Sequence, residues 1–443
     1  MTVPSAEGPR RQNQQHRRVS RKTIVRRRVL FSSAAVVVVV LVAAVAFVVY
    51  QYNDLSNGIH RSSISLPKTS AKRGVAQNTG ATNILVMGLD SRLDENGNPL
   101  PAATYNALHA GSGSDGGYNT NVLMLIHIPA GGGKAVGISI PRDDYVAFPG
   151  SPYGESMGKI KEAYGLELAQ TQQNLVNTQP NLSQAEVYQQ ARSAARQEEI
   201  TTVSQFLGGV PINHFIEVTM AAFYELAVAV QPIKVCLAEA TSDPYSGANF
   251  TAGYQELNAS QAVSFVRQRR DENNTALDFT DLDRERRQQA FVISLLYKLE
   301  HENVFTNFGL MQTLIDTAKQ NIALDSGFDL LSFASDAKRF AGGGISFDTL
   351  PITGFATIGG QDVNTVDLTQ IQSTTAQLIA ASDASATATS RAKASASASK
   401  KGSGKQSASS APSSTPSATA STPPNVSTEW AIPISSGAVP CVK

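Results

Sequence analysis

The strongest constraint on this chain is an uncharged run over residues 29–50, which is dominated by valine and alanine. A helix of roughly 20 apolar residues crosses about 30 Å of hydrocarbon, so the run predicts a transmembrane helix. A cleavable signal peptide has a shorter apolar region, of about 7 to 15 residues, and small residues at its cleavage site. The sequence Phe-Val-Val-Tyr at 47–50 is a poor cleavage site. We therefore expect an uncleaved signal-anchor in the cytoplasmic membrane.

The charges before this span predict its orientation. Arginines and one lysine crowd residues 1–28, with Glu7 as the single acid among them. By the positive-inside rule this basic tail stays in the cytoplasm, and the rest of the chain is extracytoplasmic, beginning with a linker over 51–79. A nucleic-acid-binding arm is the alternative interpretation, but orientation charges belong directly before a span. Lys plus Arg number 37 against 36 Asp plus Glu, so no nucleic-acid partner is expected.

The composition changes again near the C-terminus. Residues 381–428 are almost wholly Ser, Ala, Thr, Pro and Lys. This composition has too little apolar surface to offset the entropy of ordering, so it predicts a disordered linker. A short C-terminal segment, 429–443, follows it and carries apolar side chains at Trp430, Ile432 and Ile434.

The two cysteines, Cys236 and Cys441, leave two possibilities open. A disulfide between them would fasten the C-terminal segment to the main domain, and an extracytoplasmic location permits oxidation. The alternative is a buried free Cys236 and a reactive Cys441. No CxxC motif or Cys/His cluster offers the four ligands of a structural zinc site.

Residues 80–380 alternate strand and helix signals without a Pro/Ser-rich break. Short apolar runs typical of buried strands lie at 83–88, 122–128 and 136–140. Helices are predicted at 185–207 and 284–299. Residues 215–230 fit either an apolar helix or a strand–helix pair. The fold class is therefore α/β: a single large domain with a central, mainly β core sheet flanked by helices.

Familiar catalytic signatures are absent from the sequence. It contains no GxxxxGK[ST], GxGxxG, HExxH or GxSxG pattern. The six histidines are scattered, and His127 on an apolar run is expected to be packed or surface-facing rather than catalytic.

Charged residues follow two of the predicted strands. Asp90 and Arg92 come after the first strand, and Arg142 and Asp143 come after the third. Ligands of α/β folds bind at the carboxyl ends of strands. A carboxylate beside an arginine suits a metal-assisted phosphate site, because the acid holds a hard cation and the guanidinium grips phosphate oxygens. Salt-bridged turns are the alternative.

Two further groups of arginines point to an anionic partner. Period-two alternation places Arg267 and Arg269 on one side of a predicted extended strand. Asp281, Arg284 and Arg287 share one face of the predicted helix that follows. Arginines near a helix start oppose the helix dipole, which favours an anion between them. A surface ion-pair network is the alternative.

Taken together, these residues resemble the LytR-CpsA-Psr family of membrane-anchored wall glycopolymer ligases. The resemblance rests on ordered motifs: NILVMGLDSR (83–92), ISIPRD (138–143), KIKEAYG (159–165), GVPINHFIEV (209–218), LNASQAVSFVRQR (257–269) and DLDRERRQQ (281–289). It implies transfer of a glycan phosphate from a polyprenyl-pyrophosphate carrier to a peptidoglycan sugar hydroxyl, with Mg²⁺ or Mn²⁺ and a pyrophosphatase side activity. The loops and the ending VPCVK look most like actinobacterial members, which attach arabinogalactan or a similar polymer.

The resemblance also implies roles for single residues. The metal-side aspartate matches Asp90, with Arg92 in the same motif. The catalytic and phosphate-gripping positions match Arg142, Arg267, Arg269, Asp281 and Arg284. The substrate-binding positions match Arg92, Lys159, Arg287 and Gln288.

One position departs from the family's pattern. Asn121 stands where the family usually has a second metal-binding aspartate. An amide oxygen can coordinate Mg²⁺ but brings no charge, so metal affinity should fall unless another acid such as Asp115 substitutes. Because of this departure, a non-catalytic, membrane-anchored receptor or scaffold for lipid-linked wall glycans is the alternative function. A transcriptional attenuator is a weaker alternative, because the arginine tail lacks a recognition fold.

Overall fold

The computed structural model describes residues 58–66, 80–110, 117–274, 277–301, 308–399 and 431–443. Contacts divide the chain into two compact units, Met1–Asn57 and Gly58–Lys443. The first unit, with the predicted basic tail and span at 29–50, lies outside the described residues. No helix in the described part of the chain is long and apolar enough to cross a membrane.

An eight-stranded mixed sheet forms the centre of the second unit, with the order β1-β12-β7-β2-β3-β4-β13-β16. Its strands are β1 (His60–Ser62), β2 (Thr82–Leu89), β3 (Thr120–Ile128), β4 (Ala135–Ser139), β7 (His214–Val218), β12 (Ile322–Asp325), β13 (Ile345–Thr349) and β16 (Ile434–Ser435). The strands predicted at 83–88, 122–128 and 136–140 are confirmed as β2, β3 and β4.

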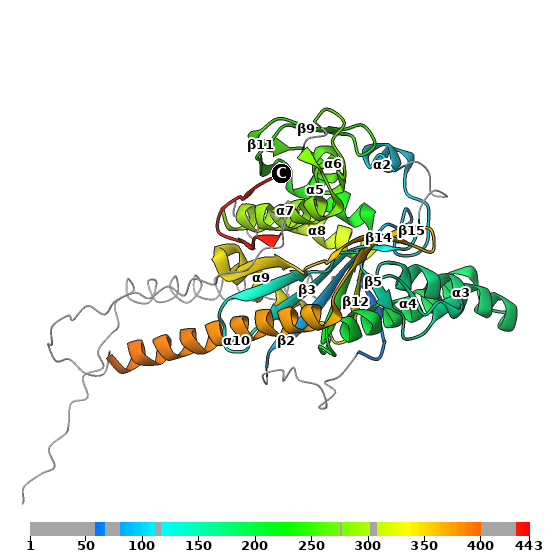
Figure 1. The fold of residues 1–443 in the computed structure, drawn as a ribbon, viewed down its shortest axis with the longest axis horizontal. Coiled ribbons are helices and arrows are strands. Elements are labelled where there is room, and N and C mark those ends of the chain that lie inside the picture. Colours follow the sequence, from blue (N-terminus) through cyan, green and yellow to red (C-terminus); the bar gives the residue numbers. More distant parts are fainter. Residues whose placement is uncertain (1–57, 67–79, 111–116, 275–276, 302–307, 400–430) are drawn as a thin grey trace, which may run out of the picture. The chain divides into compact units, whose positions relative to one another are not determined.

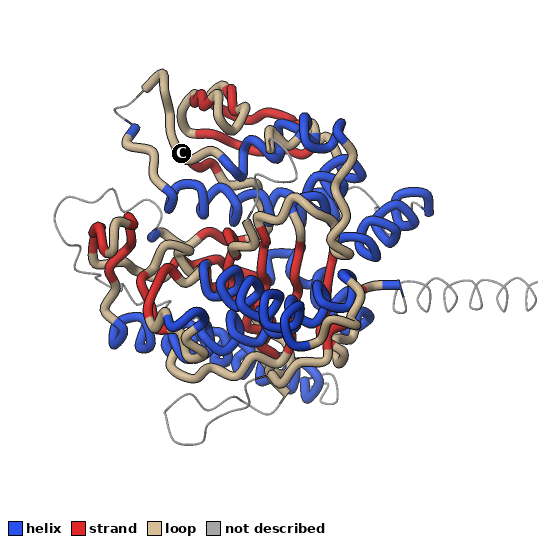
Figure 2. The backbone as a smooth tube through the Cα atoms, turned by 90° about the vertical axis from the view of Figure 1, so that its right-hand side faces the viewer, coloured by secondary structure: helices blue, strands red, loops and turns tan. Residues whose placement is uncertain are grey.

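Helices cover both faces of this sheet (Figures 1 and 2). The helices of the described part of the chain are α2 (Ala102–Ala107), α3 (Glu162–Thr178), α4 (Gln184–Phe206), α5 (Met220–Val230), α6 (Ala259–Arg267), α7 (Asp281–His301), α8 (Phe308–Asn321), α9 (Leu330–Arg339) and α10 (Leu368–Ser399), with short helical turns η1 (Pro152–Gly154) and η4 (Phe340–Gly344). On one face, Leu85, Leu125 and Ile138 of the sheet form a core with Ile200 of α4 and Ile371 of α10.

Helix α7 lies on the other face. Its Gln289 donates hydrogen bonds of 2.8 Å to the hydroxyls of Ser139 and Thr349 on neighbouring strands β4 and β13. The smaller sheets pair β5 (Tyr145–Ala147) with β6 (Met157–Lys159), β14 (Gly354–Ile358) with β15 (Gln361–Thr365), β9 (Thr241–Asp243) with β10 (Ala248–Phe250), and β8 (Ile233–Leu237) with β11 (Gly253–Leu257) and β17 (Cys441–Val442).

The predicted helices at 185–207 and 284–299 are confirmed as α4 and α7, and residues 215–230 form the strand–helix pair β7 and α5. The extended strand predicted around Arg267 is wrong, because α6 continues through that residue. A capping box begins the helix: the Asn258 side chain accepts from the Gln261 N–H at 2.9 Å, and the Gln261 side chain accepts from the Asn258 N–H at 3.0 Å. This cap and the apolar face of α6 outweigh the strand propensity of Phe265 and Val266.

The disordered linker predicted from residue 381 begins too early, because α10 continues through Ser399. Alanine-rich sequence has high helix propensity, and this part of the helix also packs on the sheet. Ser382 donates to the Lys134 carbonyl at 2.7 Å, and Ser385 accepts from the Lys134 N–H at 2.8 Å. Asp383 lies 3.3 Å from His127, which is fully buried, as a packed histidine would be. Residues 400–428 lie outside the described part.

The C-terminal segment returns to the main domain at two places. β16 pairs with β13 at the edge of the central sheet, and β17 pairs with β8. Of the two possibilities for the cysteines, the structure contains the Cys236–Cys441 disulfide, which closes a sequence separation of 205 residues.

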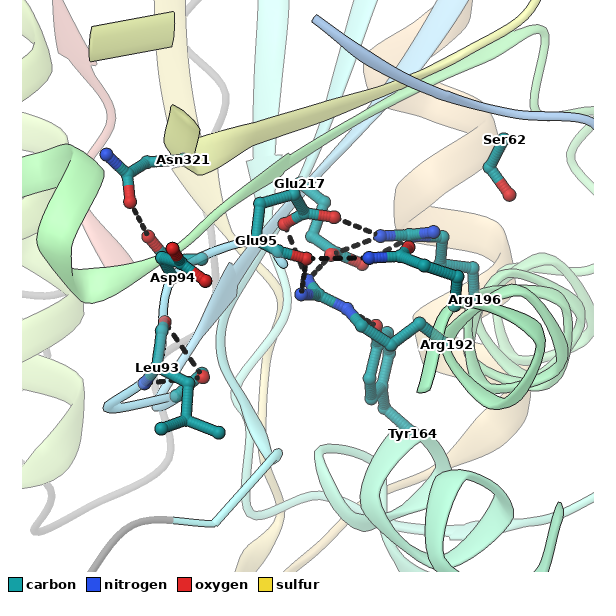
Figure 3. Close-up of polar contacts among 12 residues, drawn as sticks. Ser62, Leu93, Asp94, Glu95, Tyr164, Arg192, Arg196, Glu217 and Asn321 are labelled. Carbon is teal, nitrogen blue, oxygen red and sulfur yellow. Dashed lines mark hydrogen bonds and ion pairs between the residues drawn. The ribbon is translucent and has the colours of Figure 1, made fainter. Parts of the chain in front are cut away.

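Four charged side chains are buried between α4, β7 and the loop after β2. Figure 3 shows Arg192 and Arg196 pointing toward Glu95 and Glu217. Arg192 and Arg196 lie 2.8 and 2.6 Å from the Glu95 carboxylate, and Nε of Arg196 lies 2.9 Å from Glu217. All four side chains are at most 1% exposed. Within the described part of the chain these four charges pair with one another, so the network holds α4 against the sheet in one position.

Replacing Arg192 by Met should therefore destabilise the protein strongly. The change leaves Glu95 and Glu217 with too little positive charge in a buried position. We expect a loss of about 3 to 5 kcal/mol in the free energy of unfolding, measured by urea denaturation. Arg391 on α10 is exposed, so Arg391→Met is the matched control and should change stability by less than about 0.5 kcal/mol. Equal stabilities for the two variants would contradict this account.

Candidate functional site

Three neighbouring central strands, β2, β3 and β4, bring residues of the candidate site together at one end of the sheet. Strands β2 and β4 both run antiparallel to β3, so their carboxyl ends lie beside the start of β3. Asp90 directly follows β2, Arg142 follows β4, and Asn121 lies at the start of β3. The topology therefore brings together residues that are far apart in the sequence.

The guanidinium of Arg142 forms a two-pronged ion pair with Asp281, the first residue of α7. Nε and Nη2 of Arg142 each lie 3.0 Å from a carboxylate oxygen of Asp281. Nη1 of Arg142 donates to Oδ1 of Asn121 at 2.5 Å. Arg284 donates to Asp281 at 2.9 Å and to the Asn121 carbonyl at 3.3 Å. One carboxylate thus holds two arginines and fastens α7 to the end of the sheet.

Asp143 is the second carboxylate of this group. Its Oδ1 lies 2.6 Å from Nζ of Lys161 and 3.8 Å from Nζ of Lys159. Sequence reasoning selected Lys159 but missed Lys161, and it gave Asp143 only a place beside Arg142. The alternation Lys-Ile-Lys at 159–161 was the available signal, because alternate residues of an extended segment share a side.

Arg267 and Arg269 lie where α6 ends. Arg267 is half-buried and donates to the carbonyl of Leu108. The charge of Asp90 raises the pKa of Arg267, whereas Arg92 and the exposed Arg269 lower it. The charge of Arg269 also lowers the pKa of Asp281 and of Arg284, so Arg269 influences the ion pairs at the start of α7 as well as Arg267.

The cations of the site are incompletely compensated. Burial lowers the pKa of Arg284 to about 10, and Arg142 and Arg269 add to this effect against the attraction of Asp281. Burial also lowers the pKa of Arg267, with further contributions from Arg92 and Arg269. Burial alone would raise the pKa of Asp281, but Arg284 and Arg142 lower it. An anion bound here would restore the electrostatic energy that the buried arginines lack.

The structure does not bring Arg287 to this group. Its side chain is fully buried and donates to the main-chain oxygen of Lys443 at 2.7 Å, to Gln268 at 2.6 Å and to Thr241 at 3.0 Å. Arg287 therefore holds the C-terminal segment and the end of α6 against α7, and a substrate role for it has no support in this geometry. Gln288 donates to the carbonyl of Val266 at 3.3 Å and lines a small pocket with Asn121.

The fit of a divalent cation depends on Asp90 and Asn121. The described residues contain no group of three or more His, Cys, Asp or Glu side chains arranged to hold a metal. Oδ1 of Asn121 is engaged by Arg142, and Asp115 lies outside the described part. Asp90 follows β2 beside the arginines. A Mg²⁺ at this position would therefore take one protein oxygen from Asp90 and its other ligands from substrate phosphates and water.

Comparison with known proteins identifies the chain's relatives. The model of the LytR_cpsA_psr family matches residues 46–380, which include the charged residues around Arg142, Asp281 and Arg267 and every strand of the central sheet except β16. The chain belongs to the LytR-CpsA-Psr family.

Individual relatives agree with this membership. The chain is 36% identical over 296 residues to the cell wall biosynthesis protein LcpA of Corynebacterium glutamicum, covering 66% of this chain and 55% of LcpA. It is 27% identical over 237 residues to the polyisoprenyl-teichoic acid–peptidoglycan teichoic acid transferase TagU of Enterococcus faecalis, covering 53% and 65%. The matches span little more than half the length of LcpA, 55%, and of the probable cell wall biosynthesis protein LcpB of the same organism, 56%.

A solved LytR-Csp2A-Psr enzyme from Actinomyces oris is 18% identical to this chain. The match covers 72% of this chain and 95% of that enzyme, with a TM-score of 0.46.

Glu285 is a further titratable group of the site in this family member, and sequence reasoning gave it no role. It lies one turn after Asp281 on α7 and accepts a hydrogen bond of 3.4 Å from the Arg142 N–H. Burial raises the pKa of Glu285 to about 8, and the charge of Asp281 adds to the shift against Arg284 and Arg142. Glu285 is therefore neutral below about pH 8 and gains a negative charge above it.

We expect any anion-dependent activity of the site to fall as pH rises through about 8. The new charge on Glu285 would cancel part of the positive potential that holds an anion. Glu285→Gln keeps the acceptor for the Arg142 N–H and cannot ionise, so it should remove this alkaline fall. The measurement is the rate of phosphate release from geranyl pyrophosphate between pH 6 and 9.5. An identical alkaline limb in the variant would contradict the assignment.

Proposed function

We propose that this chain is a membrane-anchored phosphotransferase. It would transfer a glycan phosphate from a polyprenyl-pyrophosphate carrier to a peptidoglycan sugar hydroxyl, with release of phosphate from pyrophosphate as a side activity. Family membership supports the reaction class. The observation that carries the proposal is the cluster of arginines around Asp281 and the end of α6, where Arg142 and Arg284 share one carboxylate and burial lowers the pKa of Arg284 and Arg267.

In this proposal the arginines stabilise the charge of the pyrophosphate. Arg269 is exposed and Arg267 half-buried, so both are accessible to a donor, whereas Arg142 is held by protein partners. The acceptor hydroxyl oxygen bonds to the phosphorus that carries the glycan, and the bond from that phosphorus to polyprenyl phosphate breaks. The leaving group departs with the electron pair. Catalysis is then mainly positioning and electrostatic stabilisation.

Asp281 has a positioning role in the proposal. Both of its carboxylate oxygens accept hydrogen bonds from Arg142 or Arg284, and these arginines lower its pKa. A carboxylate in this state is a weak base. In this proposal the hydroxyl proton therefore passes to Asp90, the carboxylate directly after β2.

We also propose that the site uses Mg²⁺ or Mn²⁺, held by Asp90 together with phosphate oxygens of the donor. The bound cation would supply further positive charge against the leaving group. A signal-anchor at 29–50 would place the domain outside the cytoplasmic membrane, where a lipid-linked donor is accessible. Arabinogalactan or a similar polymer is the glycan expected from the actinobacterial features of the sequence.

A receptor for lipid-linked wall glycans is the second candidate. The observation that favours it is Asn121, whose amide oxygen is engaged by Arg142 and brings no charge to a metal. A receptor binds the donor without turnover, whereas the enzyme releases phosphate in the presence of a divalent cation.

Phosphate release by the unmodified chain separates these two candidates, and Arg269→Ala tests the role of the exposed arginine. The full-length chain in detergent should release phosphate from geranyl pyrophosphate with Mg²⁺ and should stop when the metal is chelated. Losing one cation that stabilises the transition state should lower kcat roughly 100-fold. The neighbouring Arg270 is exposed and stacks on Tyr245, 4.3 Å from the ring centroid, so Arg270→Ala is the matched control. Donor binding without phosphate release by the unmodified chain would support the receptor instead.

Asn121→Asp tests the metal site. One carboxylate oxygen can keep the hydrogen bond from Arg142, and the second oxygen and its charge become available to a cation. The Mg²⁺ concentration for half-maximal phosphate release should fall by about tenfold. An unchanged or higher requirement for Mg²⁺ would show that this position does not contribute to metal binding.

A further inference from the structure

A pocket of about 460 Å³ adjoins the charged site, because Asp143 and Asp281 are among its lining residues. One wall is the hairpin of β14 and β15, which carries Phe355, Thr357 and Asp362. The other wall includes Asp143 and Asp281. The hairpin lies beside β5, because Asn364 of β15 forms a parallel bridge with Asp144, directly before β5 (Figure 1). The pocket is therefore continuous with the proposed site of reaction.

The hairpin is fixed to the site by Asn364 of β15. The Asn364 N–H donates to the carbonyl of Asp143 at 2.8 Å, and its side-chain amide donates to the carboxylate of Asp144 at 3.0 Å. Asn364 is 7% exposed and Asp144 is fully buried. Gly359 and Gly360 have φ values of 59° and 80°, which a tight turn between the strands requires. The wall is thus held at a defined distance from Arg142 and Asp143.

The lining of the pocket suits a polyhydroxylated ring. Phe355 is 64% exposed although it is a large aromatic side chain. Its face can pack against the C–H groups of a sugar ring. The hydroxyl of Thr357 and the carboxylate of Asp362, which are hydrogen-bonded at 2.9 Å, can bind sugar hydroxyls from the side. This combination of one apolar platform and a few convergent polar groups is typical of a ligand pocket.

Charge divides this pocket from the arginine group. Among the described residues that line it are three carboxylates, Asp143, Asp281 and Asp362, and no lysine or arginine. Asp143 and Asp281 are already paired with Lys161, Arg142 and Arg284, so the described lining residues offer no free cation to a pyrophosphate or another polyanion. A neutral glycan needs none, and its hydroxyl groups can donate to the carboxylates.

We propose that this pocket binds the acceptor, a neutral glycan chain, and presents one of its hydroxyls to the donor held by the arginines. The proposal rests on the proposed function and adds the place and the chemistry of the second substrate. Phe355 is its aromatic platform, and Asp362 and Thr357 are its polar contacts. The hairpin is a specificity element, because it forms one side of the acceptor site and none of the arginine group.

The test compares transfer with hydrolysis in the full-length chain. The donor is a prenyl-pyrophosphate-linked sugar, and the acceptor is a soluble peptidoglycan glycan fragment. The measured quantity is the ratio of glycan phosphate transferred to the acceptor to phosphate released into water. Phe355→Ala should lower this ratio about tenfold, which corresponds to the loss of an aromatic contact of about 1.4 kcal/mol. Phe355→Trp should restore the ratio.

Tyr254→Ala is the matched control. Tyr254 is 63% exposed on β11, in a different sheet, and should leave the ratio unchanged. An unchanged ratio in Phe355→Ala would overturn the proposal. So would reduced binding of Phe355→Ala to vesicles of anionic phospholipid together with an unchanged ratio, because Phe355 would then be a membrane contact.

A direct binding measurement separates this proposal from the proposed function. Calorimetric titration of the glycan fragment into the unmodified chain should show binding that Phe355→Ala weakens about tenfold and Tyr254→Ala does not. Binding without any phosphate release would contradict the proposed enzyme but support the pocket. Phosphate release without fragment binding would support the enzyme and overturn the pocket.

Discussion

The site depends on the ion pair between Arg142 and Asp281. Arg142 follows central strand β4 and Asp281 begins α7, so two hydrogen bonds of 3.0 Å join the sheet and this helix at the candidate site. Arg284 and Asn121 complete the same group of contacts. Because both oxygens of Asp281 are engaged, the pair fixes the direction of two guanidiniums before any ligand binds. Such preorganisation is the main requirement for stabilising a phosphoryl-transfer transition state.

Buried charge is handled in two ways in this fold. Around Glu95, Arg192, Arg196 and Glu217, carboxylates and guanidiniums are matched, and the result is a structural network. At the sheet edge the cations exceed the carboxylates, and burial lowers the pKa of two arginines. The first arrangement compensates its own charges, whereas the second leaves positive charge that the proposed anionic donor would compensate. This contrast distinguishes the candidate site from the more deeply buried network.

Much of this organisation could be predicted from sequence. Apolar runs bounded by turns predicted β2, β3 and β4, and antiparallel pairing then brings Asp90, Asn121 and Arg142 to one edge. Tertiary contacts decided the rest. The capping box at Asn258 extends α6 through Arg267, and packing on β4 keeps the alanine-rich start of the predicted linker helical.

Arg287 shows another limit of sequence reasoning. Spacing of three places it with Asp281 and Arg284, but the partners that bury it are Thr241, Gln268 and Lys443. The spacing of residues within α7 cannot reveal these contacts, because Thr241 lies on β9 and Lys443 in the C-terminal segment, both far from α7 in the sequence.

The most direct test of the central claim is the transfer reaction itself, with the full-length chain, a polyprenyl-pyrophosphate-linked glycan, peptidoglycan and Mg²⁺. We predict a new phosphodiester between glycan and peptidoglycan, detected by mass spectrometry and lost in Arg142→Ala. Binding of the donor with no phosphodiester formed under any divalent cation would contradict the account.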